Sequence, residues 1–180
     1  RAVFFLHWSW IVPASVHQAH PCVVFHMTDL PYGRGGSPMQ NLIVRGHKTT
    51  MLSAIRCVEE LDAGPVYLKE PLSLAGTAEE ILQRAAIAIE KMILEIIKTR
   101  PVPTPQVGEV VEFQRRQPAD GNLSTLSGLA EVYDHIRMLD GAGYPPAFLD
   151  AGKLRFEFSG AVPGDEFVEA TVRIRRVTHE

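Results

Sequence analysis

The chain has 180 residues, of which 46% are hydrophobic and 22% are charged, and its formal net charge is -3. This composition is typical of a globular protein with room for one hydrophobic core and a small appendage, and it excludes a disordered tail. A slightly acidic balance provides no broad cationic surface, so we expect a small-molecule partner rather than a nucleic acid.

The N-terminal stretch from Arg1 to Val12 has a positive end and an apolar run, as secretory signals do. His7 interrupts the run, and Pro13 resembles a helix-entry residue more than a cleavage region, so we do not expect a signal peptide. No run approaches the roughly 20 apolar residues of a membrane span. The chain lacks an initiator Met and opens on a core strand, so we expect that upstream sequence is missing.

The two cysteines, Cys22 and Cys57, lie in apolar strand-like runs, which favours free buried thiols and a reducing cytoplasm. The spacing of His17, His20 and His26 around Cys22 matches no strong zinc signature, so we expect no metal. These features predict a cytoplasmic protein without a membrane partner.

Short strands and helices alternate in the first part of the chain. Apolar runs at 2–6 and 22–25 are typical of strands buried on both faces, with a brief helix at 13–18 between them. Pro38 can start a helix that ends at Arg45, before Gly46. Strands at 49–58 and 65–74 then flank a turn, so the pattern predicts an α/β fold.

The clearest helix follows Gly76. Thr77 can cap it, Glu80 stands three residues later, and apolar residues recur from Ile81 to Ile97. We expect the helix to end near Thr99.

A proline-rich segment then separates the chain into two parts. We expect a core at 1–100, a stiff connector at 101–120 and a small module at 121–180. Within the last two segments the pattern predicts a strand at 110–113, a helix at 126–139, and strands at 154–158 and 167–174 joined by a turn at 163–165.

The most informative stretch is Phe25–Pro38, which reads FHMTDLPYGRGGSP, followed by Leu61-Asp62-Ala63-Gly64. It resembles the folate-dependent formyltransferases, which include methionyl-tRNA formyltransferase, glycinamide ribonucleotide formyltransferase and the sugar N-formyltransferases. Their members tend to read Asn-x-His-x-Ser-Leu-Leu-Pro-x-x-Arg-Gly-x-x-Pro and then Asp-x-Gly. The segments Val132–Asp140 and Gly143–Phe148 resemble the small C-terminal module of several of these enzymes.

The resemblance implies a Rossmann-like core, with a mostly parallel sheet flanked by helices, and a small C-terminal α+β module. It also implies that His26 and Asp62 are catalytic. Formyl transfer to an amine needs a donor for the developing oxyanion and a route for the amine proton, and a histidine can supply both. A nearby carboxylate can orient the imidazole. The alternative for His26 is a hydrogen-bonded structural histidine.

The sequence departs from the family pattern at Val24, which stands where the family has its catalytic Asn. Two residues apart on a strand means the same face, and valine cannot donate a hydrogen bond. We expect Thr28, Asn41 or a water to substitute for the Asn, with Thr28 as the catalytic candidate. The alternatives are a weak site or a site with another task.

The resemblance further implies sites for the formyl donor, 10-formyltetrahydrofolate, and for the amine. The donor site is expected to contain Trp8, Ser9, Trp10, Leu61, Ala63 and Gly64, although core packing explains the tryptophans equally well. The acceptor site is expected to contain Arg34, Gly35, Gly36 and Asn41, although a plain turn explains the glycines.

We therefore expect a formyltransferase that acts on a primary amine, most plausibly of a nucleotide-linked amino sugar. One alternative is a non-catalytic folate or sugar-nucleotide binding protein, which Val24 favours. The other is an enzyme like methionyl-tRNA formyltransferase. A homodimer is compatible with each of them.

Overall fold

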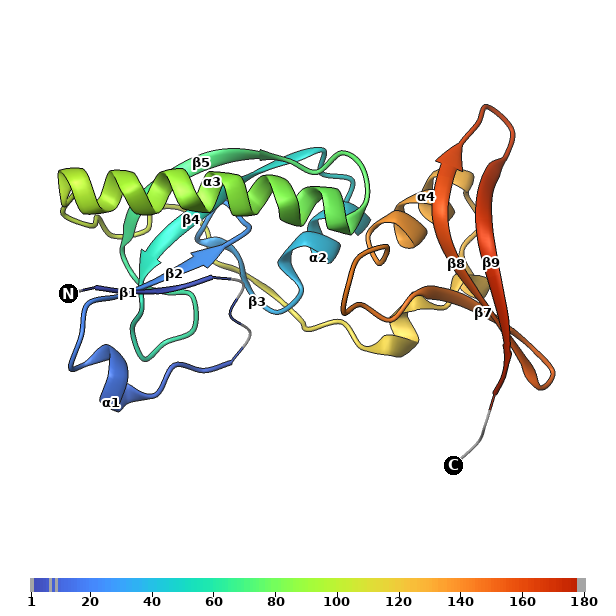
Figure 1. Ribbon diagram of the computed structural model, residues 1–180, viewed down its shortest axis with the longest axis horizontal. Coiled ribbons are helices and arrows are strands. Elements are labelled where there is room, and N and C mark those ends of the chain that lie inside the picture. The colour runs from blue at the N-terminus through green and yellow to red at the C-terminus, as the bar shows by residue number, and fades with distance from the viewer. Residues whose placement is uncertain (1, 7, 9, 178–180) are drawn as a thin grey trace.

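The computed structural model describes residues 2–6, 8 and 10–177. Figure 1 shows a larger body, formed by the described residues up to 116, and a smaller C-terminal module, formed by residues 118–177. The long helix α3 runs along the larger body, and the three last strands form the far end of the module. No helix in these described ranges is long and apolar enough to cross a bilayer.

The main sheet of the larger body has the strand order β1-β2-β4-β5. These strands are Val3–Phe5, Cys22–His26, Thr49–Arg56 and Val66–Ser73. The predicted α/β class is confirmed, but the described sheet is mixed rather than mostly parallel. β1 and β2 are parallel, whereas β4 is antiparallel to both of its neighbours, β2 and β5, and forms a hairpin with β5.

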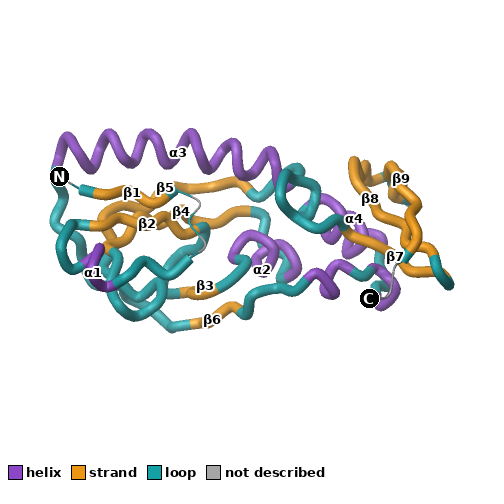
Figure 2. Tube along the Cα trace, turned by 60° about the horizontal axis from the view of Figure 1, so that its bottom comes forward, coloured by secondary structure: helices purple, strands orange, loops and turns teal. Residues whose placement is uncertain are grey.

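Helix α3, Ala78–Thr99, covers one face of this sheet (Figure 2). Thr77 and Glu80 cap its first turn reciprocally, as the sequence predicts. The buried side chains recur at helical spacing and form one stripe toward the sheet: Ala78, Ile81, Ala85, Ile89, Met92 and Ile96.

The opposite face of the sheet carries a small parallel pair, β3 (Tyr32–Gly35) and β6 (Val111–Phe113). The sequence predicts a loop over the first of these segments. It becomes a strand because a chain segment far along the sequence supplies the partners for its backbone groups. Two short helices, α1 (Ala14–His17) and α2 (Pro38–Val44), complete the body.

The proline-rich segment expected as a connector at 101–120 lies along the larger body for much of its length. Thr104 and Val66 exchange backbone hydrogen bonds of 2.7 and 2.9 Å. Phe113 is only 3% exposed and belongs to the main hydrophobic core. The division of the chain at residues 100 and 120 stays a prediction.

The C-terminal module is a small helix and a three-stranded antiparallel sheet, β7-β8-β9. Its elements are η1 Pro118–Gly121, η2 Leu123–Thr125, α4 Leu129–Arg137, β7 Ala147–Ala151, β8 Leu154–Pro163 and β9 Val168–Arg176. α4 begins three residues later than predicted, because Leu126 and Gly128 have an extended backbone. β7 forms where the sequence suggests only a turn, since β8 supplies its backbone partners.

Candidate active site

His26 is the last residue of β2 and is 8% exposed. Its Nε2 lies 2.7 Å from the carbonyl oxygen of Gly33, the second residue of β3. Its Nδ1 lies 3.5 Å from Oδ2 of Asp62. Since a neutral imidazole carries a single N–H, the short contact to a carbonyl assigns that proton to Nε2 and leaves a lone pair on Nδ1.

Asp62 lies in the connection between β4 and β5, and its backbone φ is 52°. Its carboxylate Oδ2 accepts a 2.9 Å hydrogen bond from the backbone N–H of Gly35. The connection starts beside the first residues of β2, because Arg56 pairs with Val23, yet Asp62 reaches the end of that strand. The pair therefore forms across a face of the sheet, where β3 lies, rather than at one end of it.

Close backbone packing explains the glycine after the aspartate. A Cβ at Gly64 would stand 1.7 Å from the carbonyl oxygen of Arg56, the last residue of β4. A Cβ at Gly35 would stand 2.5 Å from the carbonyl oxygen of Phe113, and the φ of Gly35 is +101°. Only glycine allows the two segments that hold Asp62 to approach their neighbours this closely.

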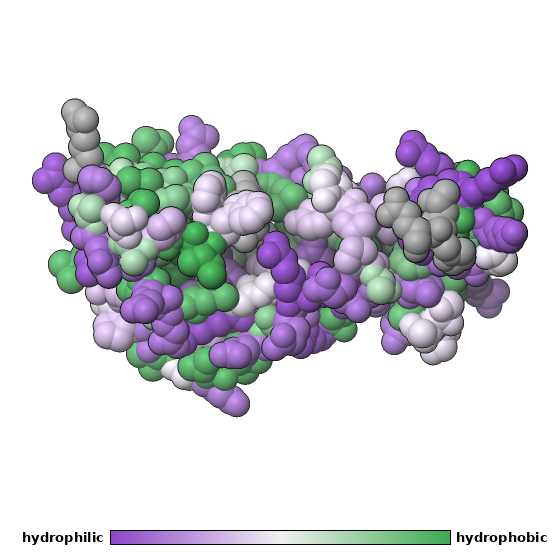
Figure 3. All heavy atoms as spheres, turned by 90° about the horizontal axis from the view of Figure 1, so that it is seen from below, coloured by the Kyte–Doolittle hydropathy of each residue, from purple (hydrophilic) through white to green (hydrophobic). Residues whose placement is uncertain are grey.

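A cavity of about 550 Å³ opens beside His26 and Asp62. Its walls include eight of the residues expected from the sequence: Trp8, Trp10, His26, Gly35, Gly36, Leu61, Asp62 and Gly64. Trp10 is 77% exposed and Leu61 63%, so large apolar side chains are presented to solvent at the cavity. In Figure 3, hydrophobic residues gather on the surface of the larger body, whereas many residues on the surface of the module are hydrophilic.

Five expected site residues are not among the described residues that line this cavity. Ser9 lies outside the described residues, and Ala63, Thr28, Arg34 and Asn41 do not line the cavity. Thr28 is fully buried, and its hydroxyl donates to the carbonyl of Gly33 at 3.3 Å. This placement disfavours Thr28 as the substitute for the missing Asn.

The side chain of Asn41 is committed to the protein's own backbone. Its Nδ2 donates to the carbonyls of Gly36 and Gln114, at 3.0 and 2.8 Å, and its Oδ1 accepts from Arg45. Asn41 therefore fastens the start of α2 to the chain after β6, and it offers no free amide to a substrate. Its expected role in acceptor binding is disfavoured for the same reason.

Arg34 also points at protein groups rather than into the cavity. Its Nη1 donates to Glu60 at 3.0 Å, while Nε and Nη2 both donate to Oε1 of Gln106, at 3.2 and 3.0 Å. Three of the five N–H donors of this guanidinium are therefore used by protein groups, which disfavours Arg34 as a partner for a substrate phosphate.

Val24 lines the cavity, as expected for the position of the family Asn. A carboxamide nonetheless lies on the cavity wall, because Gln40 from α2 is 3% exposed and lines it. Its Nε2 makes one long hydrogen bond, 3.4 Å, to the carbonyl of Met138. The sequence gives no local signal for Gln40, since its position on the wall depends on how α2 packs.

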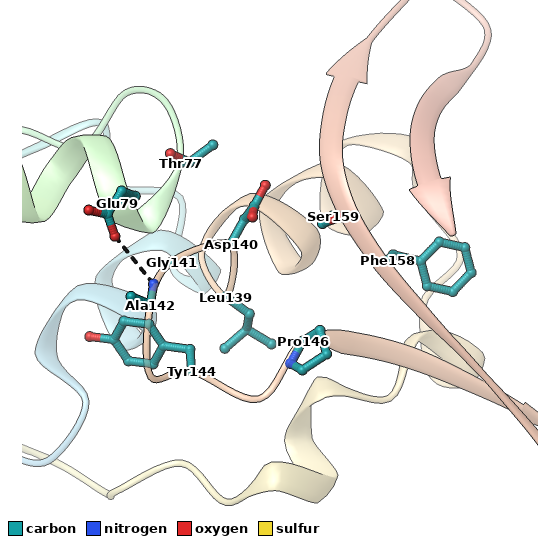
Figure 4. Close-up of a pocket in the computed structure, with 10 residues that line it drawn as sticks. All are labelled: Thr77, Glu79, Leu139, Asp140, Gly141, Ala142, Tyr144, Pro146, Phe158 and Ser159. Carbon is teal, nitrogen blue, oxygen red and sulfur yellow. Dashed lines mark hydrogen bonds between the residues drawn. The ribbon is translucent and has the colours of Figure 1, made fainter. Parts of the chain in front are cut away.

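A second hollow, of about 380 Å³, lies between the start of α3 and the module (Figure 4). None of the expected site residues that the structure describes lines it. The Glu79 carboxylate accepts the backbone N–H of Ala142 at 3.2 Å, and the Asp140 carboxylate accepts that of Gly160 at 2.7 Å. These carboxylates join segments of the protein, so we interpret the hollow as part of the seam, by which we mean the contact surface between the larger body and the module.

The chain is similar to named formyltransferases. A family model of the methionyl-tRNA formyltransferase C-terminal domain matches residues 118–175. Methionyl-tRNA formyltransferase from Gluconobacter oxydans is 30% identical over 145 residues, which are 79% of this chain and 47% of that protein. The chain thus spans about half the length of such curated relatives.

Solved structures extend the likeness to the whole described chain. The structure of methionyl-tRNA formyltransferase from Clostridium thermocellum matches with a TM-score of 0.95 and 50% identity, over 98% of this chain and 78% of that one. HypX from Aquifex aeolicus in complex with tetrahydrofolic acid matches with a TM-score of 0.72 at 16% identity, over 92% of this chain and 29% of that one. The second match shows a shared fold.

Proposed function

The chain belongs to the methionyl-tRNA formyltransferase family, and we propose that it forms the catalytic part of an enzyme that transfers a formyl group from 10-formyltetrahydrofolate to the amine of methionyl-tRNA. The observation that carries the proposal is the His26–Asp62 contact on the wall of a largely apolar cavity. A cytoplasmic location stays a prediction.

The cavity fits the folate donor in size and chemistry. Its volume of about 550 Å³ lies within the roughly 300–1,000 Å³ of small-molecule sites. Trp8, Trp10 and Leu61 would contact a flat heteroaromatic ring, and the shared fold of HypX with tetrahydrofolic acid supports this assignment. When bound, the donor supplies the activated formyl carbon.

In this proposal His26 moves the amine proton. With Nε2–H held by the Gly33 carbonyl at 2.7 Å, Nδ1 has the lone pair that can take the proton the acceptor amine gives up. The Asp62 carboxylate, 3.5 Å from Nδ1, then stabilises the imidazolium that forms. The Gly33 carbonyl therefore determines which ring nitrogen acts as the base.

Gln40 is our candidate for the donor that Val24 cannot provide. Its buried carboxamide faces the cavity, and its one hydrogen bond to the protein is long, so an N–H remains available for the oxygen on which negative charge develops. This assignment accounts for an active site without the family Asn.

The acceptor assignment replaces our expectation of a nucleotide-linked sugar. The relatives from Gluconobacter oxydans and Clostridium thermocellum, which are 30% and 50% identical to this chain, are both named methionyl-tRNA formyltransferases. Net charge is a poor guide to a local surface. Arg115 on the cavity wall, and the exposed Arg173 and Arg176 of β9, have no ion pair with the described residues. Unpaired guanidinium groups suit the phosphates of a polynucleotide.

The test uses the whole gene product, incubated with 10-formyltetrahydrofolate and either methionyl-tRNA or a panel of nucleotide-linked amino sugars, with products identified by mass. We expect formylmethionyl-tRNA, and we expect His26→Ala to lower its rate by about 10²- to 10⁴-fold. Gln40→Met should lower kcat by about 10²-fold or more, because methionine has a similar shape but cannot donate a hydrogen bond.

His20→Ala is the matched control, because His20 is an exposed histidine outside the cavity. If only a nucleotide-linked amino sugar is formylated, the acceptor is that sugar and not methionyl-tRNA. Folate binding without any product would favour the non-catalytic alternative, and a protein that binds no folate would overturn the proposal.

A further inference from the structure

The side chain of Gln106 braces the backbone around Asp62. Its Nε2 donates to the carbonyl oxygens of Asp62 and Gly64, at 2.7 and 2.8 Å. Its Oε1 accepts from Nε and Nη2 of Arg34, at 3.2 and 3.0 Å. Both N–H groups and both lone pairs of the carboxamide are therefore used.

The backbone conformation of Asp62 gives this brace a position to hold. Its φ of 52° lies in the left-handed region, which costs free energy for a residue with a side chain. Aspartate tolerates this region in turns, but a change of the backbone at Asp62 would move its carboxylate relative to Nδ1 of His26. Gln106 opposes this movement because it holds the carbonyls on either side of Ala63.

Arg34 links this brace to the histidine. Its two neighbours in β3 contact the two catalytic candidates, since the Gly33 carbonyl accepts from His26 and the Gly35 N–H donates to the Asp62 carboxylate. The Arg34 side chain reaches back to Gln106 and so closes a ring of contacts around the pair. A shift at any point of the ring would change the His26–Asp62 distance.

We propose that Gln106 and Arg34 are positioning residues, which hold the Asp62 carboxylate against His26 without touching the substrate. This inference rests on the function proposed above, and it gives Arg34 a different role from the acceptor contact that the sequence suggests. Gln106 carries no such signal in the sequence, because it lies far along the chain from Asp62.

The test is a double-mutant cycle in the full-length enzyme. Gln106→Glu keeps the shape and the acceptor for Arg34 but loses both bonds to the Asp62 connection, and Gln106→Met removes all four bonds. We expect each to lower kcat by about 10- to 100-fold through misplacement of the carboxylate, with little change in KM. In an Asp62→Asn background the same substitutions should have almost no further effect.

Gln83→Glu, on the exposed side of α3, is the matched control and should leave kcat unchanged. Arg34→Lys should lower kcat less than Arg34→Met, because one ammonium can still reach the Gln106 oxygen. Effects of Gln106 and Asp62 substitutions that multiply independently, in proteins that remain folded by circular dichroism, would overturn the inference.

A readout independent of turnover separates this inference from the proposed function. The readout is the 15N NMR spectrum of the histidine side chains, in which the His26 resonances are assigned by their loss in His26→Gln. We expect Gln106→Met and Asp62→Asn to change these resonances in the same way. This result is expected even if no acceptor is formylated. Unchanged His26 resonances in Gln106→Met, alongside changed ones in Asp62→Asn, would contradict the positioning role.

Discussion

Cys57 lies on the cavity wall, and its surroundings hold the thiol in the neutral form. Burial raises the pKa of Cys57, and the neighbouring Cys22 and the Asp62 carboxylate raise it further. Burial also raises the pKa of Cys22, which is fully buried. Since the thiolate is the reactive form, neither cysteine is suited to act as a nucleophile, and the proton chemistry of the cavity falls to His26.

This prediction concerns the two thiols. In the native protein at mildly alkaline pH, we expect iodoacetamide to label Cys57 several-fold more slowly than it labels free cysteine, and to leave Cys22 unlabelled. A folate bound in the cavity should slow labelling of Cys57 further. Mass spectrometry of the labelled peptides measures both effects, with Cys57→Ala as the control; rapid labelling of Cys57 would contradict the assigned environment.

At the scale of an element, α3 shows how local signals and burial reinforce each other. The Glu80 carboxylate accepts the N–H of Thr77 at 2.8 Å, and the Thr77 hydroxyl accepts the N–H of Glu80 at 3.3 Å. These bonds use N–H groups that the first helical turn cannot satisfy by itself. The helix therefore starts where its buried stripe begins, at Ala78.

Removal of this cap should destabilise the protein without affecting the cavity. We expect Thr77→Ala to lower the free energy of unfolding by about 0.5–2 kcal/mol, as measured by urea denaturation. Thr99→Ala, at the other end of α3, is the control and should cost less, because its hydroxyl only adds a bond to the exposed carbonyl of Glu95. If both substitutions lower the free energy of unfolding equally, the cap contributes no more stability than an exposed hydrogen bond.

At the scale of the whole molecule, the module is joined to the larger body through α4. Met138, fully buried, packs in the main core, whereas Ile136 packs in the cluster beneath the module's sheet. Between them Arg137 is 4% exposed and donates to the carbonyls of Leu74 and Gly76, at 2.6 and 2.8 Å. This buried cation crosses the seam between module and body.

Loss of this contact should destabilise the whole chain. Arg137→Met leaves the carbonyls of Leu74 and Gly76 without this donor, and it removes the 2.7 Å contact to the Asp134 carboxylate, which among the described residues keeps only Lys48 at 3.9 Å. We expect a loss of about 3–5 kcal/mol in the free energy of unfolding. Arg175→Met, which breaks a more exposed ion pair in the module, should cost about 0–1 kcal/mol. A comparable cost for both, by urea denaturation, would argue against a special role for the seam.

Much of the fold could be predicted because its signals are local. The cap of α3, the apolar runs of β2 and β4 and the proline at the start of α2 each follow from residues close in sequence. β3 was not predicted, because a Gly-rich segment becomes a strand only when β6 lies beside it. The direction of β4 against β2 likewise depends on how the chain crosses the sheet.

The sequence by itself determined the family resemblance and the two residues, His26 and Asp62, that meet at the cavity, because their spacing from glycines and prolines is a local property. Only the tertiary structure decided what the other polar side chains do. Arg34 and Asn41 bind protein groups, whereas Gln40 and Gln106 take up places at or behind the cavity wall. The physical reason is that a hydrogen bond is defined by atoms within about 3 Å, which sequence separation does not reveal.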